Sequence, residues 1–419
     1  MALPCDGFVV NEFVDREDEL SKLVKMVSFS VNEEVKLPDF QRVKHLVGKS
    51  NVGKSSLLCK FHNNDIGLEN VHSIFLSFKD YYQIVGEEFI VNVLDTLCAA
   101  VDRLLERQHI NRLRKKPNEL TFELSATLEV LIKRRGVVAF LLDEVNMLSP
   151  DQTTLLEDYF LSKILPLKDV VVVLAGRHLV TGWKDFALRP YKKGDKENVI
   201  ELSGFGFEFS QKQIQTINPQ IENLIPEIHE VSGGSPGNNK KIVEQLGDPP
   251  HFDELAAIQA CNQEFYDALS DVSMVLSESI SSEILPVLEA LCVLEDFEKE
   301  NEMPRMLSVH PDLSGTWTIP RCRDFLNNVL SKIQIGPGRL VNWDMDKSAL
   351  VIEEQTRFNL EKELKIRNVA LWKSLHCTAM KMYDEWVKVY GADSIFADKA
   401  EYHKRILQNA GVNPEETCK

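Results

Sequence analysis

The segment from Gly48 to Ser55, Gly-Lys-Ser-Asn-Val-Gly-Lys-Ser, restricts the possible folds of this chain more than any other feature. It matches the Walker A pattern Gly-x-x-x-x-Gly-Lys-Ser. Apolar residues at 43–47 predict a strand before it, and a helical pattern begins near Lys54. A phosphate-binding loop needs this context, because its N–H groups and the helix N-terminus bind the phosphates together. The segment therefore predicts an α/β domain that binds a purine nucleoside triphosphate, with ATP favoured.

The residues of this loop have separate chemical tasks. Its glycines let backbone N–H groups face the phosphates, and the helix N-terminus adds a partial positive charge. Lys54 is expected to bridge the β- and γ-phosphates and to contribute to catalysis, and Ser55 to offer its hydroxyl to Mg²⁺. The predicted nucleotide-binding residues of the loop are Gly48, Lys49, Ser50, Asn51, Val52, Gly53, Lys54, Ser55 and Ser56.

A second motif is the apolar run from Val137 to Leu142, which ends in Asp143 and Glu144. Burying two acids at the end of an apolar strand is costly unless they have a function. The run matches a Walker B strand. Asp143 is then expected to hold Mg²⁺ through water, and Glu144 to orient or deprotonate the attacking water as a catalytic residue. The alternative is a surface acid pair that caps a strand.

A third candidate is Arg177, which follows the apolar run from Val170 to Leu174. An arginine at the tip of a sheet strand can reach a γ-phosphate and report its presence, so Arg177 is predicted to be catalytic. The alternative is a solvated loop arginine. The neighbouring His178 is expected to have a structural or exposed position.

Gly233-Gly-Ser-Pro-Gly237 is the fourth candidate. A rigid proline among glycines can press the backbone against a nucleotide base, so Pro236 is predicted to contact the nucleotide. The alternative is a plain turn between two helices.

Apolar strands alternate with amphipathic helices in the first half of the chain, which predicts a parallel sheet covered on both faces. Strands are predicted at 43–47, 73–78, 137–142, 170–174 and 198–202. Helices are predicted at 11–30, from about Lys54, and at 87–114, 120–134 and 152–164. Residues 1–206 are therefore predicted to form a P-loop nucleotide-binding domain.

The strand pattern disappears after this domain. Short helical patterns at 209–275 predict a helical lid domain at 207–278. Helices at 283–297 and 321–333, separated by a loop and followed by a hairpin with strands at 339–343 and 349–352, predict a winged-helix domain at 279–360. Two final helices, at 358–390 and 394–410, make residues 361–419 a C-terminal helical segment.

Composition excludes several classes of protein. The net charge of −16 disfavours a protein that grips nucleic acid with its whole surface. The basic residues between Arg103 and Lys116 are expected to be a solvated helix end. No signal peptide or membrane span is apparent, so a cytoplasmic protein is predicted. The eight cysteines show no disulfide or zinc spacing and are expected to be reduced and mostly buried: Cys5, Cys59, Cys98, Cys261, Cys292, Cys322, Cys377 and Cys418.

Taken in order, these motifs resemble those of the signal-transduction ATPases with numerous domains (the STAND class). The stretch from Phe13 to Leu20, Phe-Val-Asp-Arg-Glu-Asp-Glu-Leu, resembles the motif that opens many of these proteins. The resemblance covers about residues 10–360. It implies that the opening motif lies near the adenine, so that the remaining predicted nucleotide-binding residues are Phe13, Val14 and Arg16.

The resemblance also implies a function. Proteins of this class act as ATP-binding switches that hydrolyse ATP slowly and control signalling or assembly through nucleotide-dependent domain rearrangement. ATP or ADP and Mg²⁺ are the expected cofactors, and a protein partner or self-assembly is expected, without a membrane. Two alternatives are a DNA-associated ATPase of the replication-initiator or transcription-regulator kind, using the winged helix, and a nucleotide-binding scaffold without turnover. The acidic charge disfavours DNA binding.

Overall fold

A parallel sheet of five strands forms the centre of the first half of the molecule, as predicted. The strands are β1 (Val43–Val47), β2 (Val71–Ser77), β3 (Val137–Asp143), β4 (Val170–Gly176) and β5 (Val199–Glu201). Their order in the sheet is β2-β3-β4-β1-β5, and every pairing is parallel. All residues of β3 and β4 are buried. Both faces of these strands must therefore be covered, which explains their uninterrupted apolar sequences.

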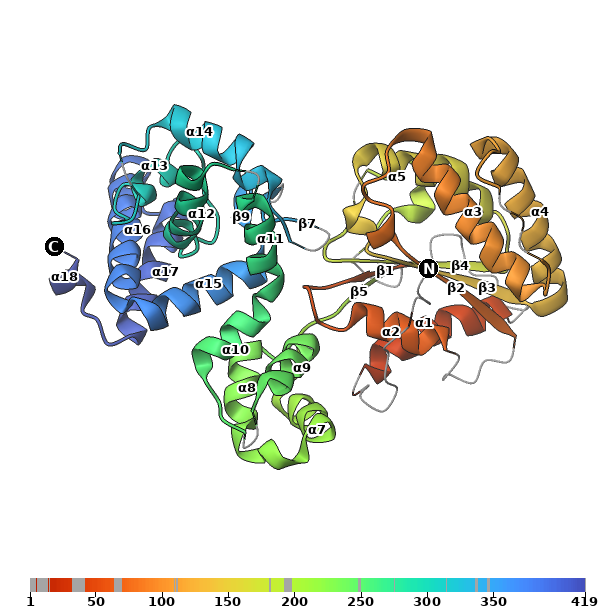
Figure 1. The fold of residues 1–419 in the computed structure, drawn as a ribbon, viewed down its shortest axis with the longest axis horizontal. Coiled ribbons are helices and arrows are strands. Elements are labelled where there is room, and N and C mark those ends of the chain that lie inside the picture. Colours follow the sequence, from red (N-terminus) through yellow and green to blue (C-terminus); the bar gives the residue numbers. More distant parts are fainter. Residues whose placement is uncertain are drawn as a thin grey trace. The chain divides into compact units, whose positions relative to one another are not determined.

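Strand β4 shows how the two faces divide. Val170, Val172 and Leu174 join one hydrophobic core, while the residues between them join another. Helices α1 (Glu17–Val31) and α2 (Lys54–His62) supply the second core, through residues such as Leu23 and Leu57. Helices α3 (Gly86–Leu104), α4 (Pro117–Arg135) and α5 (Pro150–Leu156) supply the first core, on the other face (Figure 1). The predicted fold class, an α/β P-loop fold followed by helices, is confirmed.

The computed structural model describes residues 5, 14, 16–31, 42–63, 70–108, 110, 112–180, 182–191, 198–247, 250–274, 276–313, 315–335, 338–344 and 347–418. The chain divides into two compact units, Met1–Val243 and Glu244–Lys419. The finer division into four domains stays a prediction. None of the helices in the described ranges combines the length and the apolar character needed to cross a membrane.

The first unit ends in three helices, α7 (Phe207–Ile217), α8 (Ile225–Ser232) and α9 (Pro236–Gln245), and its boundary with the second unit falls within α9. The prediction of short helices after residue 206 is confirmed. Two further pieces, α6 (Ser162–Ile164) and a π-helical turn at Glu157–Leu161, continue α5, where a single helix was predicted.

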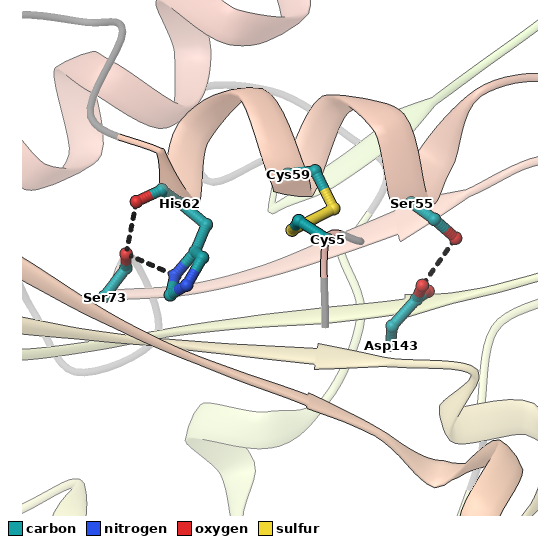
Figure 2. Close-up of a disulfide and its surroundings, with 6 residues drawn as sticks. All are labelled: Cys5, Ser55, Cys59, His62, Ser73 and Asp143. Atoms are coloured by element: carbon teal, nitrogen blue, oxygen red, sulfur yellow. Dashed lines mark hydrogen bonds between the residues drawn. A yellow bond between two sulfur atoms is a disulfide. The ribbon is translucent and has the colours of Figure 1, made fainter. Parts of the chain in front are cut away.

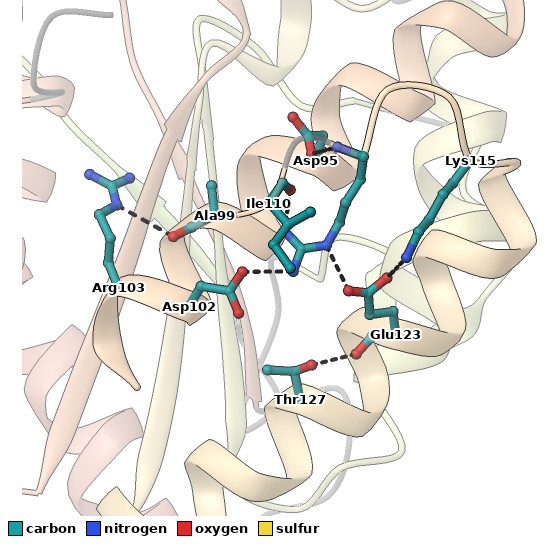
Figure 3. Close-up of polar contacts among 9 residues, drawn as sticks. Asp95, Ala99, Asp102, Arg103, Ile110, Lys115, Glu123 and Thr127 are labelled. Atoms are coloured by element: carbon teal, nitrogen blue, oxygen red, sulfur yellow. Dashed lines mark hydrogen bonds and ion pairs between the residues drawn. The ribbon is translucent and has the colours of Figure 1, made fainter. Parts of the chain in front are cut away.

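The helix predicted at 87–114 is too long, because α3 ends at Leu104. The chain then turns back, and Arg112 becomes buried with only 5% of its surface exposed. Its Nη2 donates to Asp102 Oδ2 at 2.7 Å and its Nε to Glu123 Oε1 at 2.7 Å. Figure 3 labels the two acceptors, Asp102 and Glu123, and shows Glu123 also accepting from Lys115. The expectation of a solvated basic stretch is therefore wrong for Arg112, which joins the end of α3 to α4.

The second unit is mostly helical. Its helices are α10 (Glu254–Cys261), α11 (Gln263–Ser273), α12 (Glu278–Leu291), α13 (Glu302–Leu307), α14 (Ile319–Asn328), α15 (Glu354–Arg367), α16 (Val369–Tyr390), α17 (Ile395–Asn409) and α18 (Pro414–Thr417). Helix α13 lies where only a loop was predicted. The helix predicted at 358–390 is two helices, because Asn368 leaves helical geometry and its Oδ1 caps α16 by accepting from the Leu371 N–H at 3.0 Å.

The predicted hairpin is present. Strands β8 (Val341–Asp344) and β9 (Ala349–Ile352) pair antiparallel, and Phe297 bridges to Leu350. A shorter pair, β6 (Gln334–Ile335) and β7 (Gly338–Arg339), precedes them. Three helices followed by this hairpin have the element order expected of a winged-helix module, although the winged-helix assignment itself stays a prediction.

The cysteines do not all follow the expectation of reduced thiols. Cys5 pairs with Cys59 on α2 (Figure 2), and Cys377 on α16 pairs with Cys418. The partners are 54 and 41 residues apart, so neither pair has a recognisable local spacing. The remaining four cysteines form no disulfide and are buried, as predicted: Cys98, Cys261, Cys292 and Cys322.

Candidate functional site

The predicted phosphate-binding loop joins the end of β1 to the start of α2. Gly53 takes a φ of 96°, a left-handed conformation that glycine tolerates best. Gly48 lies so close to the chain after β5 that a Cβ there would be 2.5 Å from the Leu202 carbonyl oxygen. Gly53 is the N-cap residue of α2 and has no side chain that could cap the helix. The first turn of the helix therefore directs its N–H groups toward the loop, which is the arrangement that binds an anion.

Lys54 is buried inside the curve of this loop, with 6% of its surface exposed. Its Nζ donates to the carbonyl oxygens of Gly48 at 2.7 Å and Lys49 at 2.8 Å. The Lys54 ammonium is thus held by two carbonyl groups at the start of the loop. This position next to the helix N-terminus concentrates positive charge where the motif predicts phosphates.

The structure brings the two predicted metal ligands together. Ser55 Oγ on α2 donates to Asp143 Oδ2 at the end of β3, at 2.5 Å (Figure 2). Strand β4 separates β1 from β3 in the sheet, so this contact depends on the sheet order. Asp143 is 3% exposed, and burial raises its pKa, opposed by the Ser55 hydrogen bond.

These two oxygens suit Mg²⁺, which binds through one or two protein oxygens and otherwise keeps water and substrate phosphates. The described residues contain no group of three or more His, Cys, Asp or Glu that could hold a metal ion.

Glu144, which is predicted to orient or deprotonate the attacking water, has an unusual backbone conformation with φ 58°. Its Oε2 is buried and has no hydrogen-bond partner among the described residues. Burial and the neighbouring Asp143 raise the pKa of its carboxyl, whereas Lys54, Arg177 and Lys79 act in the opposite direction. A backbone conformation of this kind costs free energy and is common at functional sites. A buried carboxyl with a raised pKa is suited to accept a proton.

Arg177 follows β4 directly, at the same edge of the sheet as Ser55 and Asp143. Its guanidinium is near enough to Glu144 to lower the pKa of that carboxyl. Its backbone N–H donates to Asn146 Oδ1 at 2.9 Å. The side chain of His178 is exposed, in line with one of the two positions expected for it.

The region around Pro236 also reaches the loop. The carbonyl of Asn51 accepts from the Gly237 N–H at 2.9 Å and from Ser235 Oγ at 3.0 Å. The Asn51 amide donates to Asn238 Oδ1 at 3.1 Å. Pro236, the first residue of α9, is buried among these contacts. Sequence reasoning found Pro236 through its glycine neighbours but missed these partners, for which the sequence offers no separate signal.

The opening motif lies beside the same loop. Val14 and Arg16 are both buried, and Arg16 has a φ of 76°. The Arg16 guanidinium donates to the carbonyl oxygens of Val52, at 3.2 Å, and Ser203, and it lies 4.9 Å from the centre of the Phe205 ring. Arg16 therefore ties the loop to the chain after β5. Phe13 lies outside the described residues, and the predicted adenine contacts stay a prediction.

Comparison with known proteins gave structural similarities only. No family model matches the chain, and no curated protein matches it. Among solved structures, Cdc6p from Pyrobaculum aerophilum is 13% identical, with a TM-score of 0.41, over 87% of this chain and 98% of that one. A STAND protein with a tetratricopeptide repeat sensor from Pyrococcus horikoshii is 14% identical, with a TM-score of 0.34, over 95% of this chain and 52% of that one.

A third similar structure is Drosophila ORC bound to DNA, which is 13% identical with a TM-score of 0.34 over 99% of both chains. The STAND class, which the sequence resembles, is thus represented among the similar structures. Because all three TM-scores are below 0.5, these structures do not determine the role of any residue in this chain.

Proposed function

We propose that this protein binds ATP with Mg²⁺ and hydrolyses it slowly, as a molecular switch. The observation that carries the proposal is the contact of Ser55 with Asp143 beside the buried Lys54. A hydroxyl from the first turn of α2 and a carboxylate from the end of β3 converge there, next to a helix N-terminus whose cap residue is a glycine. This combination serves phosphoryl transfer, in which positioning and charge stabilisation supply most of the catalysis.

Each residue then has a distinct task. Lys54 and the first turn of α2 bind the β- and γ-phosphates, and Ser55 and Asp143 hold the metal. When bound, Mg²⁺ would neutralise part of the phosphate charge. The carboxyl of Glu144 orients a water molecule and takes its proton. Arg177 stabilises the charge that develops on the γ-phosphate.

The contacts of Asn51 with α9 support a switch. The loop that holds the phosphates is bonded directly to Ser235, Gly237 and Asn238. A change in the loop between ATP and ADP would alter these bonds, so the two nucleotides would favour different positions of the lid helices. A switch requires this difference in affinity, because a ligand that binds both states equally shifts neither.

The decisive experiment identifies the bound nucleotide. Purified protein is denatured, and the released nucleotide is separated by chromatography, with Lys54→Ala beside it. We expect ATP or ADP from the unmutated protein and a strong reduction in the variant. If neither protein releases nucleotide, and ATP does not raise the melting temperature of the unmutated protein, the proposal is wrong.

Phosphate release separates the remaining possibilities. A scaffold without turnover would bind ATP but release no phosphate. A DNA-associated ATPase would shift labelled duplex DNA at near-physiological salt, with an affinity that falls as salt rises. We expect slow phosphate release and no such shift.

A further inference from the structure

Asn146 lies in the short 3-10 helix Val145–Met147, directly after Glu144. Its Oδ1 accepts a hydrogen bond from the backbone N–H of Arg177 at 2.9 Å. No sequence motif singled out this residue. It connects the loop that carries the proposed water-activating acid to the strand tip that carries the proposed phosphate-sensing arginine.

The sheet itself does not provide this connection. The register between β3 and β4 ends at the pair Leu142–Leu174, before either strand reaches its functional residue. Strand β4 continues to Gly176, but there it pairs with Val47 of β1. The Asn146 side chain therefore joins the β3 and β4 tips beyond the end of their ladder.

Gly176 makes this approach possible. A Cβ at position 176 would lie 2.8 Å from Asn146 Oδ1 and 3.3 Å from Asn146 Cβ. The first distance is shorter than real Cβ contacts allow, so any side chain at position 176 would push Asn146 away. The glycine and the asparagine form one close contact, and disturbing either should disturb the other.

The conformation of Glu144 makes the contact important. Its φ of 58° must be maintained by the surrounding structure, and its buried Oε2 has no hydrogen-bond partner among the described residues to hold it. A hydrogen bond two residues later, to the neighbouring strand tip, restricts how far this loop can move.

We propose that Asn146 is a positioning residue for ATP hydrolysis, which fixes the Glu144 carboxyl relative to Arg177 so that both face the γ-phosphate. This inference rests on the proposed function. It predicts that Asn146 acts through Arg177 and Glu144 and contributes little to the affinity for ATP, which Lys54 and α2 provide. A displacement of about 1 Å in such a group can cost on the order of 100-fold in rate.

Three variants test the position. Asn146→Ala removes the acceptor and should lower kcat at least tenfold, with the Kd for ATP changed less than threefold. Gly176→Ala should have the same effect by displacing Asn146. Asn146→Asp keeps an acceptor at the same place, so it should retain most of the activity at its own pH optimum.

The aspartate variant also offers a readout that a merely structural role would not move. A restored kcat at an unchanged Kd for ATP in Asn146→Asp would show that the site needs a hydrogen-bond acceptor for the Arg177 N–H. The matched control is Gly206→Ala, because a Cβ at that glycine would meet no atom within 4 Å.

A double-mutant cycle provides the decisive result. If Asn146 acts through Arg177, the pair Asn146→Ala and Arg177→Ala should be no slower than Arg177→Ala alone. Losses that multiply, an unchanged kcat in Asn146→Ala, or equal losses in Asn146→Ala and Asn146→Asp would each overturn the inference. Melting temperatures of all variants exclude a general loss of folding.

A second measurement, the ratio of the affinities for ATP and ADP, tests the role of Asn146 even if the protein does not hydrolyse ATP. Unmutated protein that binds ATP but releases no phosphate would remove hydrolysis from the proposed function, yet the ratio could still be measured. Asn146→Ala should then reduce the preference for ATP over ADP in the same direction as Arg177→Ala, within the threefold limit set for its Kd for ATP. An unchanged ratio would reject the role of Asn146 in that case as well.

Discussion

Unusual backbone conformations gather at the candidate site. In the described part of the chain, five residues other than glycine have positive φ, and three of them are Arg16, Asn51 and Glu144. Arg16 and Asn51 are both held by several hydrogen bonds, whereas Glu144 lies between Asp143, the proposed metal ligand, and Asn146. Each such conformation costs roughly 1–3 kcal/mol and persists only where neighbours maintain it. These three residues are therefore places where the candidate site lowers the stability of the fold.

Glu144→Gln tests whether Glu144 contributes to ATP hydrolysis while lowering the stability of the fold. The change removes the charge that burial disfavours but preserves the size of the side chain, and the pKa of the acid is raised. We therefore expect phosphate release to fall on the order of 100-fold, since general-base catalysis contributes 10²–10⁴-fold. The Kd for ATP should be retained and the melting temperature should rise.

The control is Glu129→Gln, the same change at an exposed position on α4, which should alter neither quantity. A Glu144→Gln variant that hydrolyses ATP at the normal rate would remove this residue from the mechanism.

Gly237 tests the contact between the loop and α9. A Cβ at this position would lie 2.8 Å from Asn51 Cβ. Gly237→Ala should therefore displace Asn51 and weaken ATP binding roughly tenfold, equivalent to about 1.4 kcal/mol. Titration calorimetry would measure the change. Gly206→Ala, where the added methyl group meets no atom, should bind ATP normally, and equal affinities in the two variants would contradict the expectation.

At the scale of secondary-structure elements, buried polar groups decide how helices are joined. Arg112 connects α3 to α4 through Asp102 and Glu123. Hydrogen bonds from Lys115 and Arg112 outweigh burial and lower the pKa of Glu123. The Arg42 guanidinium similarly donates to backbone carbonyl groups before β4. One of them is the carbonyl oxygen of Leu165, at 2.6 Å. These contacts join segments that the hydrophobic pattern treats as separate.

Arg112→Leu should be strongly destabilising, because it leaves the buried Asp102 carboxylate without its partner. Loss of one member of such a pair costs about 3–5 kcal/mol. The unfolding transition of the first unit in urea would measure this loss of stability. Adding Asp102→Asn should recover part of the loss. The exposed Arg103→Leu should change stability by less than about 0.5 kcal/mol, and a similar loss in both variants would refute the assignment.

At the scale of the whole molecule, each compact unit contains a buried histidine that stays neutral. In the first unit, burial lowers the pKa of His45 to about 4, with a weaker opposing effect from a hydrogen bond to Leu188. In the second unit, burial lowers the pKa of His403 well below its usual value, assisted by the charges of His376, Lys399 and Arg357. His403 Nδ1 lies 2.9 Å from His376 Nδ1, so one ring donates to the other.

Both units should therefore lose stability as the pH falls below about 6.5. The unfolded histidine takes up a proton there, whereas the folded one does not, so the stability present at neutral pH is lost on acidification. For His45 the loss should reach about 2 kcal/mol at pH 5. Urea unfolding at pH 7 and pH 5 would measure it. His45→Gln should reduce the pH dependence of the first unit only, and an unchanged dependence would contradict the prediction.

The sequence by itself determined the class of fold and predicted the centre of the candidate site. The apolar strands required a sheet covered on both faces, and the predicted Walker A and Walker B residues lie at strand ends, where chain direction alone brings them to one edge. These features are local, because a few neighbouring residues specify them. The breaks after Leu104 and at Asn368 were missed because they depend on distant partners and on a single cap.

Only the tertiary structure decided which distant groups meet. The strand order placed Ser55 against Asp143, the chain after Leu104 returned Arg112 to Asp102, and tertiary folding brought Cys5 to Cys59 and Cys377 to Cys418. The same is true of Asn146 beyond the end of the β3–β4 ladder. Hydrophobic periodicity specifies which face of an element is buried, but a hydrogen bond between segments far apart requires both backbones to be in place first.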